Sequence, residues 1–257
     1  MHMHRGENNC IENKKIFSSD KWKTAGIVII LLVLFESFLE YSTLDLNGII
    51  HFVLGYVGFQ NRGVFFASVI KFMLPQLGAL LIWGNYFEEN ILKNSSIIFT
   101  RTKKASKIVW KYTKELITGV LLTMVLFEVG ICCIYYLKGY RSENLYSLLL
   151  DLVIYAIYMI TVLVITNVLS FVCRNMYGVC IVLFLQLVAL EYLYPIYKEG
   201  ERICYGVPTA AILLVHNAEV NYKCKLAWCG YLAVIMFFSI LVGTVIVKRK
   251  EIYIEGD

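Results

Sequence analysis

Six stretches of this 257-residue chain are long and apolar enough to cross a bilayer as helices. The run Ile27–Phe35 is apolar on every face, without the alternating pattern of a membrane barrel strand. In lipid, the backbone of such a run must satisfy its own hydrogen bonds, which a helix does. We therefore predict an all-α membrane protein, a six-transmembrane-helix bundle with spans at 24–41, 63–86, 116–137, 145–172, 176–194 and 228–247.

Composition and charge placement support this class and give an orientation. Apolar residues make up 59% of the chain and charged residues only 17%, whereas soluble domains carry about a quarter charged residues. With the N-terminus in the cytoplasm, 16 of the 24 Lys and Arg fall on the inner side and seven outside, with Lys71 in a span. Both termini are therefore predicted to be cytoplasmic, as an amphipathic segment 1–23 and a tail 248–257. Basic residues that border spans face membrane lipid, so no nucleic-acid partner is expected.

Four charged residues lie away from the ends of the predicted spans, where an ion is costly unless it faces water or a partner. They are Glu36, Lys71, Glu128 and Asp151. One interpretation is the polar lining of an outward cavity along a substrate pathway. The other is interhelical ion pairing or snorkelling near helix ends.

Enzymatic chemistry finds little support in the sequence motifs. No G-x-x-x-x-G-K-[ST] occurs, so any ATP must be handled by a partner chain. His51 and His216 are isolated, which does not fit the paired His of a zinc protease helix. The pair Glu88-Glu89 resembles that of CAAX-type intramembrane proteases, but the Arg of that motif is absent and Lys93 is the nearest cation. An intramembrane hydrolase using Glu88, Glu89, His51 or His216 stays as an alternative function.

The cysteines leave one question open. Cys204 and Cys224 fall in the predicted outer segment and Cys229 starts the last span. A disulfide between two of these three is an open alternative to free thiols.

The longest inner segment, 88–114, combines charge with an apolar patch. As a helix it would place Lys103, Lys107 and Lys111 on one face at i, i+4 and i+8, beside the apolar run Ile97–Phe99. Such a surface fits docking of another protein. The plain alternative is a basic loop lying on phospholipid headgroups.

The order of residues in this segment resembles the permease subunits of ABC-2 type ABC transporters. The resemblance covers most of the chain and is greatest for small bacterial permeases of peptide, antibiotic or lantibiotic export and immunity systems. It rests on an acidic residue after the second span, then a Thr-Arg, then basic residues leading into the third span. The matching residues are Glu88 or Glu89, Thr100-Arg101, Lys103, Lys104, Lys107 and Lys111. Two positions depart from the family pattern: Thr102 stands where Pro is frequent, and Asn94-Ser95 where Gly-Thr is common.

The resemblance implies a transporter subunit that performs no bond chemistry and has no catalytic residue, metal or cofactor of its own. ATP and Mg would be bound by a separate ABC ATPase subunit, docked through the residues matched above. A second permease subunit, identical or paralogous, would complete a dimer in the bacterial cytoplasmic membrane. Tyr205–Pro208 followed by Thr209–His216 resembles the short outer re-entrant element of that family. A non-transporting membrane anchor or sensor is the remaining alternative.

Overall fold

The computed structural model describes residues 19–37, 46, 49, 53–54, 61–92, 105–141, 145–173, 177–198 and 222–254, and the elements within these ranges are helical. Long α-helices follow one another along the chain, with a short π-helical turn, η1 (Glu88–Leu92), after the second of them. The long helices are α2 (Ser19–Ser37), α4 (Arg62–Trp83), α6 (Ala105–Leu137), α7 (Leu145–Cys173), α8 (Tyr177–Lys198) and α10 (Tyr222–Ile254).

Within the described residues, five helical stretches are long and apolar enough to span a membrane. They are Arg62–Ile91, Ser106–Leu137, Leu148–Cys173, Tyr177–Pro195 and Lys225–Arg249. The prediction of a helical, multi-pass membrane protein is therefore confirmed at this level. The predicted first span, 24–41, overlaps α2, but residues 38–41 lie outside the described part. α2 is not among the five, and the sixth span stays a prediction.

Two helices extend well beyond the spans predicted for them. α6 begins at Ala105 rather than at 116, and α10 runs from Tyr222 to Ile254 rather than over 228–247. Each has 33 residues, or about 50 Å at 1.5 Å per residue, against a hydrocarbon core of about 30 Å. The predicted bounds stop where charges such as Lys114 begin, but the helical backbone continues through them.

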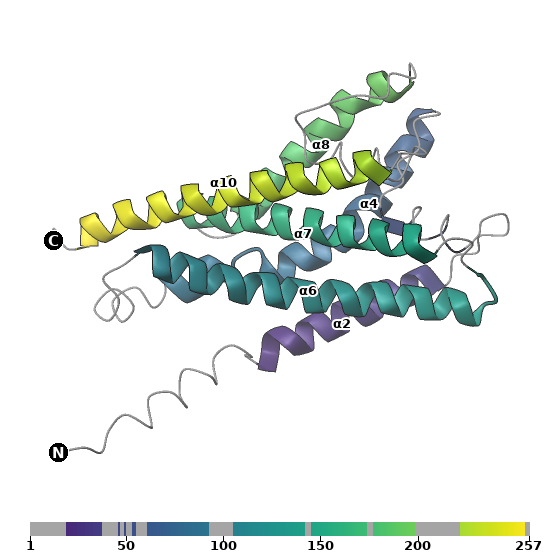
Figure 1. The fold of residues 1–257 in the computed structure, drawn as a ribbon, viewed down its shortest axis with the longest axis horizontal. Coiled ribbons are helices and arrows are strands. Elements are labelled where there is room, and N and C mark those ends of the chain that lie inside the picture. Colours follow the sequence, from purple (N-terminus) through teal and green to yellow (C-terminus); the bar gives the residue numbers. More distant parts are fainter. Residues whose placement is uncertain are drawn as a thin grey trace.

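Successive helices alternate in direction, so α2 begins and α10 ends toward the same end of the bundle (Figure 1). α7 lies at the centre, in contact with α4, α6, α8, α10 and η1. In its apolar stretch 72% of the residues are buried, against 22% in α10. The apolar side chains that α10 leaves exposed suit contact with lipid.

At the other end of the bundle α4 and α8 are tied together. The Arg62 guanidinium donates to Glu191 Oε2 at 2.7 Å and lies over the Tyr194 ring, 4.2 Å from its centroid. The exposed pair therefore links the beginning of α4 to the last part of α8, which rise side by side in Figure 1.

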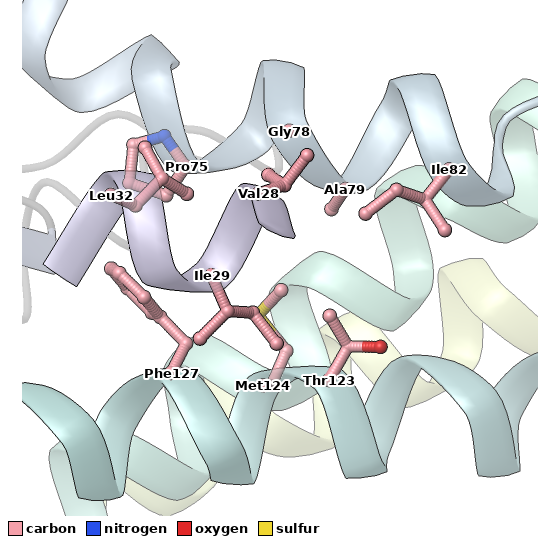
Figure 2. Close-up of a pocket in the computed structure, with 10 residues that line it drawn as sticks. All are labelled: Val28, Ile29, Leu32, Pro75, Gly78, Ala79, Ile82, Thr123, Met124 and Phe127. Atoms are coloured by element: carbon pink, nitrogen blue, oxygen red, sulfur yellow. The ribbon is translucent and has the colours of Figure 1, made fainter. Parts of the chain in front are cut away.

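A narrow apolar crevice lies where α2, α4 and α6 meet (Figure 2). The α4 wall is built from Pro75, Gly78 and Ala79, small or ring-closed residues that let α2 come close. A Cβ at Gly78 would lie only 2.8 Å from Val28 Cγ1. Apart from Thr123 the walls are apolar, so the crevice is a packing feature of the bundle.

Candidate functional site

The apolar stretch Arg62–Ile91 is interrupted where α4 ends. The α-helix ends at Trp83 and a turn follows. The helical structure then begins again and continues as η1. The side-chain amide of Asn167, from α7, fills the interruption: its Nδ2 donates to the Trp83 carbonyl and its Oδ1 accepts from the Phe87 N–H, both at 2.8 Å. In a continuous α-helix the Phe87 N–H would donate to the Trp83 carbonyl directly. Asn167 thus takes the place of one backbone hydrogen bond and holds the helix open.

The surroundings of this opening are buried and tightly packed. Asn167 is fully buried, and Trp83 and Phe87 are nearly so. Unpaired backbone groups at such a depth are costly, and the Asn167 amide satisfies both. Its Nδ2 also donates to the Leu163 carbonyl at 2.8 Å, which fixes its orientation. A Cβ at Gly84 would lie 2.4 Å from the Leu80 carbonyl oxygen, so the turn requires glycine.

Charged and aromatic side chains join this region to the neighbouring helices. Lys21 Nζ lies 2.5 Å from Glu89 Oε2 and 5.1 Å from the centroid of the Tyr86 ring. The Tyr86 hydroxyl donates to Glu115 Oε2 at 2.8 Å. These four residues, which we call the η1 cluster, connect α2, the end of the second span and α6.

Trp83 is the apolar anchor beside the η1 cluster. Its Nε1 donates to Thr123 Oγ1 at 3.1 Å, and its ring meets the Trp22 ring edge-on at a centroid distance of 5.8 Å. A Cβ at Gly119 would lie 2.4 Å from the Trp83 ring, so the missing side chain lets α6 pack against the indole. The end of the second span is therefore held by contacts with α2, α6 and α7 together.

The structure describes part of the predicted coupling segment. Glu88 and Glu89 both lie on η1, and Glu88 Oε2 is enclosed without a hydrogen-bond partner among the described residues. Lys107 and Lys111 are exposed near the beginning of α6. Arg101, Lys103 and Lys104 lie outside the described residues, as does the apolar run 97–99. The continuous basic face that the sequence predicts thus stays a prediction.

Of the four intramembrane charges, Asp151 has a clear partner. Its fully buried carboxylate forms an ion pair with Lys225 Nζ, which joins α7 to α10. The sequence analysis places Lys225 in an outer loop, but it lies within α10 and is only 5% exposed. For Asp151 the structure therefore shows interhelical ion pairing.

The other three intramembrane charges differ from one another. Glu128 on α6 is buried, and its Oε1 has no hydrogen-bond partner within the described part of the chain. Lys71 on α4 is half-buried. The side chain of Glu36 lies outside the described residues.

A buried polar network that the sequence analysis misses crosses three helices. The Tyr158 hydroxyl of α7 donates to Gln76 Oε1 of α4 at 3.4 Å and accepts from Gln186 Nε2 of α8 at 3.2 Å. All three side chains are buried. Amides inside apolar runs are a usable signal, because lipid cannot hydrogen-bond to them. Attention to uncharged amides would have singled out Gln76, Gln186 and Asn167 alike.

The residues of the hydrolase alternative give no assembled centre within the described structure. Among the described residues no group of three or more His, Cys, Asp and Glu side chains gathers as metal ligands would. His51, His216 and Cys204 lie outside those residues, as does the predicted re-entrant element at 205–216. Cys229 is a free thiol in α10.

The fold and the buried polar contacts define a multi-pass helical membrane protein in which the apolar stretch Arg62–Ile91 is interrupted. Comparison of the chain with protein-family models, with curated proteins and with solved structures finds no match.

Proposed function

We propose that the chain is the membrane-spanning permease subunit of an ABC-2 type ABC transporter in a bacterial cytoplasmic membrane. It works as a permease dimer driven by separate ATPase subunits, which bind the ATP and Mg. The observation that carries the proposal is the interruption at Trp83–Phe87, because the candidate coupling segment 88–114 begins directly behind it.

The contacts around η1 suit a part that transmits movement. Glu89 is paired with α2, Tyr86 with α6, and the Phe87 N–H with α7. A displacement applied to η1 from the cytoplasmic side therefore acts on three helices at once. Closure of an ATPase dimer on ATP would supply such a displacement, and the two permease bundles would rock against each other.

The buried residues of the bundle support a substrate class for this proposal. Most of the buried side chains described are apolar, and Glu128 and Asp151 are buried carboxylates among them. A hydrophobic or cationic peptide-like molecule fits that combination, as expected for antimicrobial peptide export or immunity. The transported molecule undergoes no bond chemistry in this mechanism.

The experiment that tests the proposal is affinity purification of the full chain from its native host in mild detergent. Co-purifying proteins are identified by mass spectrometry, and the complex is assayed for ATP hydrolysis. A stoichiometric P-loop ATPase is the expected result. Its absence from a folded and abundant preparation would overturn the proposal.

Two lysines of α6 provide a matched pair for locating the docking face. Lys111 lies over the Tyr112 ring at 5.8 Å, near the beginning of α6, and Lys138 over the Tyr135 ring at 5.3 Å, just beyond its end. Lys111→Glu and Lys138→Glu each replace a cation that lies over a tyrosine ring, one near the beginning of α6 and one just beyond its end. We expect Lys111→Glu to reduce recovery of the ATPase at least severalfold and Lys138→Glu to leave it unchanged. Equal recovery in both variants would place the docking face elsewhere.

A further inference from the structure

One side of α6 is a continuous apolar face that suits contact with lipid. Its members recur three or four positions apart, as residues on one side of a helix do. All are exposed: Leu122, Val125, Leu126, Val129, Cys133 and Tyr136. From Val125 to Tyr136 the face covers 11 positions, about 16 Å at 1.5 Å per residue. That is about the depth of one leaflet, half of a hydrocarbon core of roughly 30 Å.

The chain folds back where this face ends. Directly after α6, Gly139 has a φ of +95°, a left-handed conformation that glycine adopts without strain. Its N–H donates to the Tyr136 carbonyl at 3.1 Å. The Tyr140 N–H donates to the Tyr135 carbonyl, also at 3.1 Å, which completes the hydrogen-bond pattern of a Schellman turn. This turn returns Arg141 to the last turn of α6 instead of leading it away from the helix.

Arg141 is held there by contacts of its side chain and its backbone. Its Nη1 donates to the carbonyls of Tyr136 and Tyr140 at 3.1 and 3.2 Å. Its guanidinium lies over the Tyr136 ring, 4.0 Å from the centroid. The Arg141 carbonyl accepts from the Leu46 N–H at 3.2 Å. These contacts leave the N–H groups on Nε and Nη2 unused, and a planar fork that is already positioned loses little freedom when it binds an anion.

A second arginine shows what Arg141 lacks. Arg62 also lies over a tyrosine ring, that of Tyr194, but its charge is compensated by the Glu191 carboxylate at 2.7 Å. No carboxylate among the described residues forms an ion pair with Arg141, and its side chain is exposed. Its positive charge is therefore available to an anion from outside the chain, at the level where the apolar face of α6 ends.

We infer that Arg141 and the apolar face of α6 form a binding site for an anionic phospholipid. The phosphate binds the guanidinium, which matches two of its oxygens with two parallel N–H groups, and an acyl chain lies along the α6 face. A lipid such as phosphatidylglycerol offers an uncompensated negative charge, whereas the choline of phosphatidylcholine cancels that of the phosphate. The site requires neither transport nor an ATPase partner, so it goes beyond the proposed function.

The test measures lipid binding to the purified full-length chain in detergent by native mass spectrometry. The chain is titrated with phosphatidylglycerol and with phosphatidylcholine of the same acyl chains. We expect the first phosphatidylglycerol to bind at an about fivefold lower concentration, the effect of one basic residue near anionic lipid. Inorganic phosphate added in excess should not displace it, because phosphate has no acyl chain. Equal binding of the two lipids, or displacement by phosphate, would overturn the inference.

Variants assign the preference to the site. Arg141→Gln removes the charge and should abolish the preference for phosphatidylglycerol. Arg141→Lys keeps the charge without the planar fork and should retain only part of the preference. The matched control Arg62→Gln changes the net charge equally, at an arginine that also lies over a tyrosine ring but is paired, and should keep the full preference. Loss of the preference in both arginine-to-glutamine variants, or its persistence in Arg141→Gln, would contradict the site.

A second measurement covers the case in which Arg141→Gln does not fold. Phosphatidylglycerol with a photoreactive diazirine in its headgroup is added to the wild-type chain and irradiated, and mass spectrometry locates the adduct. We expect the adduct within residues 136–141. Unlabelled phosphatidylglycerol should reduce it severalfold, and the same amount of phosphatidylcholine should reduce it much less. An adduct at other helix ends only, or equal reduction by both lipids, would count against the site.

Discussion

The ion pair between Asp151 and Lys225 gives the sharpest prediction about how the bundle is held together. Asp151→Asn keeps the shape of the side chain but removes its charge, which leaves the Lys225 ammonium, at 6% side-chain exposure, without its counter-ion. Breaking a buried pair by removing one partner costs about 3–5 kcal/mol. For a chain of this size each kcal/mol shifts the melting temperature by roughly 2–4 °C, so we expect a fall of about 10 °C.

The assay is thermal unfolding of the full chain in mild detergent, followed by tryptophan fluorescence. The double variant Asp151→Asn/Lys225→Met removes both charges and should recover most of the loss, because no buried charge is left unpaired. Arg62→Gln/Glu191→Gln serves as the control, since that pair joins α4 to α8 but is exposed. Removing it should cost less than about 1 kcal/mol.

Two results would refute this reasoning. A single Asp151→Asn variant that melts within about 1 °C of the wild-type chain would mean that Lys225 has other compensation. A double variant as unstable as the single one would mean that the cost arises from lost packing rather than from the unpaired charge. In either case the ion pair would not be what stabilises the packing of α7 against α10.

Three further substitutions test the region of η1, each by thermal unfolding. Asn167→Leu withdraws the partners of two backbone groups and should lower stability by roughly 2–4 kcal/mol; an unchanged stability would mean that the helix closes on itself. Gly119→Ala places a methyl group 2.4 Å from the Trp83 ring and should cost about 1–3 kcal/mol, partly restored by Trp83→Phe; no loss would contradict the tight packing. Glu89→Gln removes a partly exposed pair with Lys21 and should cost less than about 1 kcal/mol; a much larger loss would show that the pair is shielded from water.

The class of the fold was predictable from sequence because lipid leaves the backbone few solutions. A run such as Ile27–Phe35 has no polar face that could lie toward water. The long apolar stretches of α4, α6, α7, α8 and α10 can therefore be recognised in the sequence from their length and hydropathy alone. The ends of the helices were less predictable. Hydropathy stops at the first charges, whereas α6 and α10 continue through lysines that reach the headgroup region.

The contacts between helices could not be read from the sequence. Asp151 and Lys225 are 74 residues apart, and the sequence favours a loop at Lys225 because Asn221 and Lys223 come shortly before it. The insertion of Asn167 opposite Trp83 depends on how α7 is rotated and how far it is shifted against α4. The properties of single residues give neither the rotation nor the shift of one helix against another. The sequence therefore indicates where the charges lie along the chain but not which of them form pairs.

α7 is held by two polar interactions of different kinds, the Asp151–Lys225 ion pair and the hydrogen bonds of Asn167. Their difference indicates which part of the bundle can move. Asp151 and Asn167 are separated by 16 positions, about 24 Å along the helix at 1.5 Å per residue. At the first, a buried ion pair resists separation because each charge would be left alone in the interior. At the second, closing the helix exchanges two hydrogen bonds of the Asn167 amide for one between the Phe87 N–H and the Trp83 carbonyl. The exchange leaves the Asn167 Oδ1 without a partner, at a cost of about 1–3 kcal/mol, but it leaves no charge unpaired. Movement entering at η1 should therefore open and close the second span beside Asn167, while α7 and α10 travel together as one body.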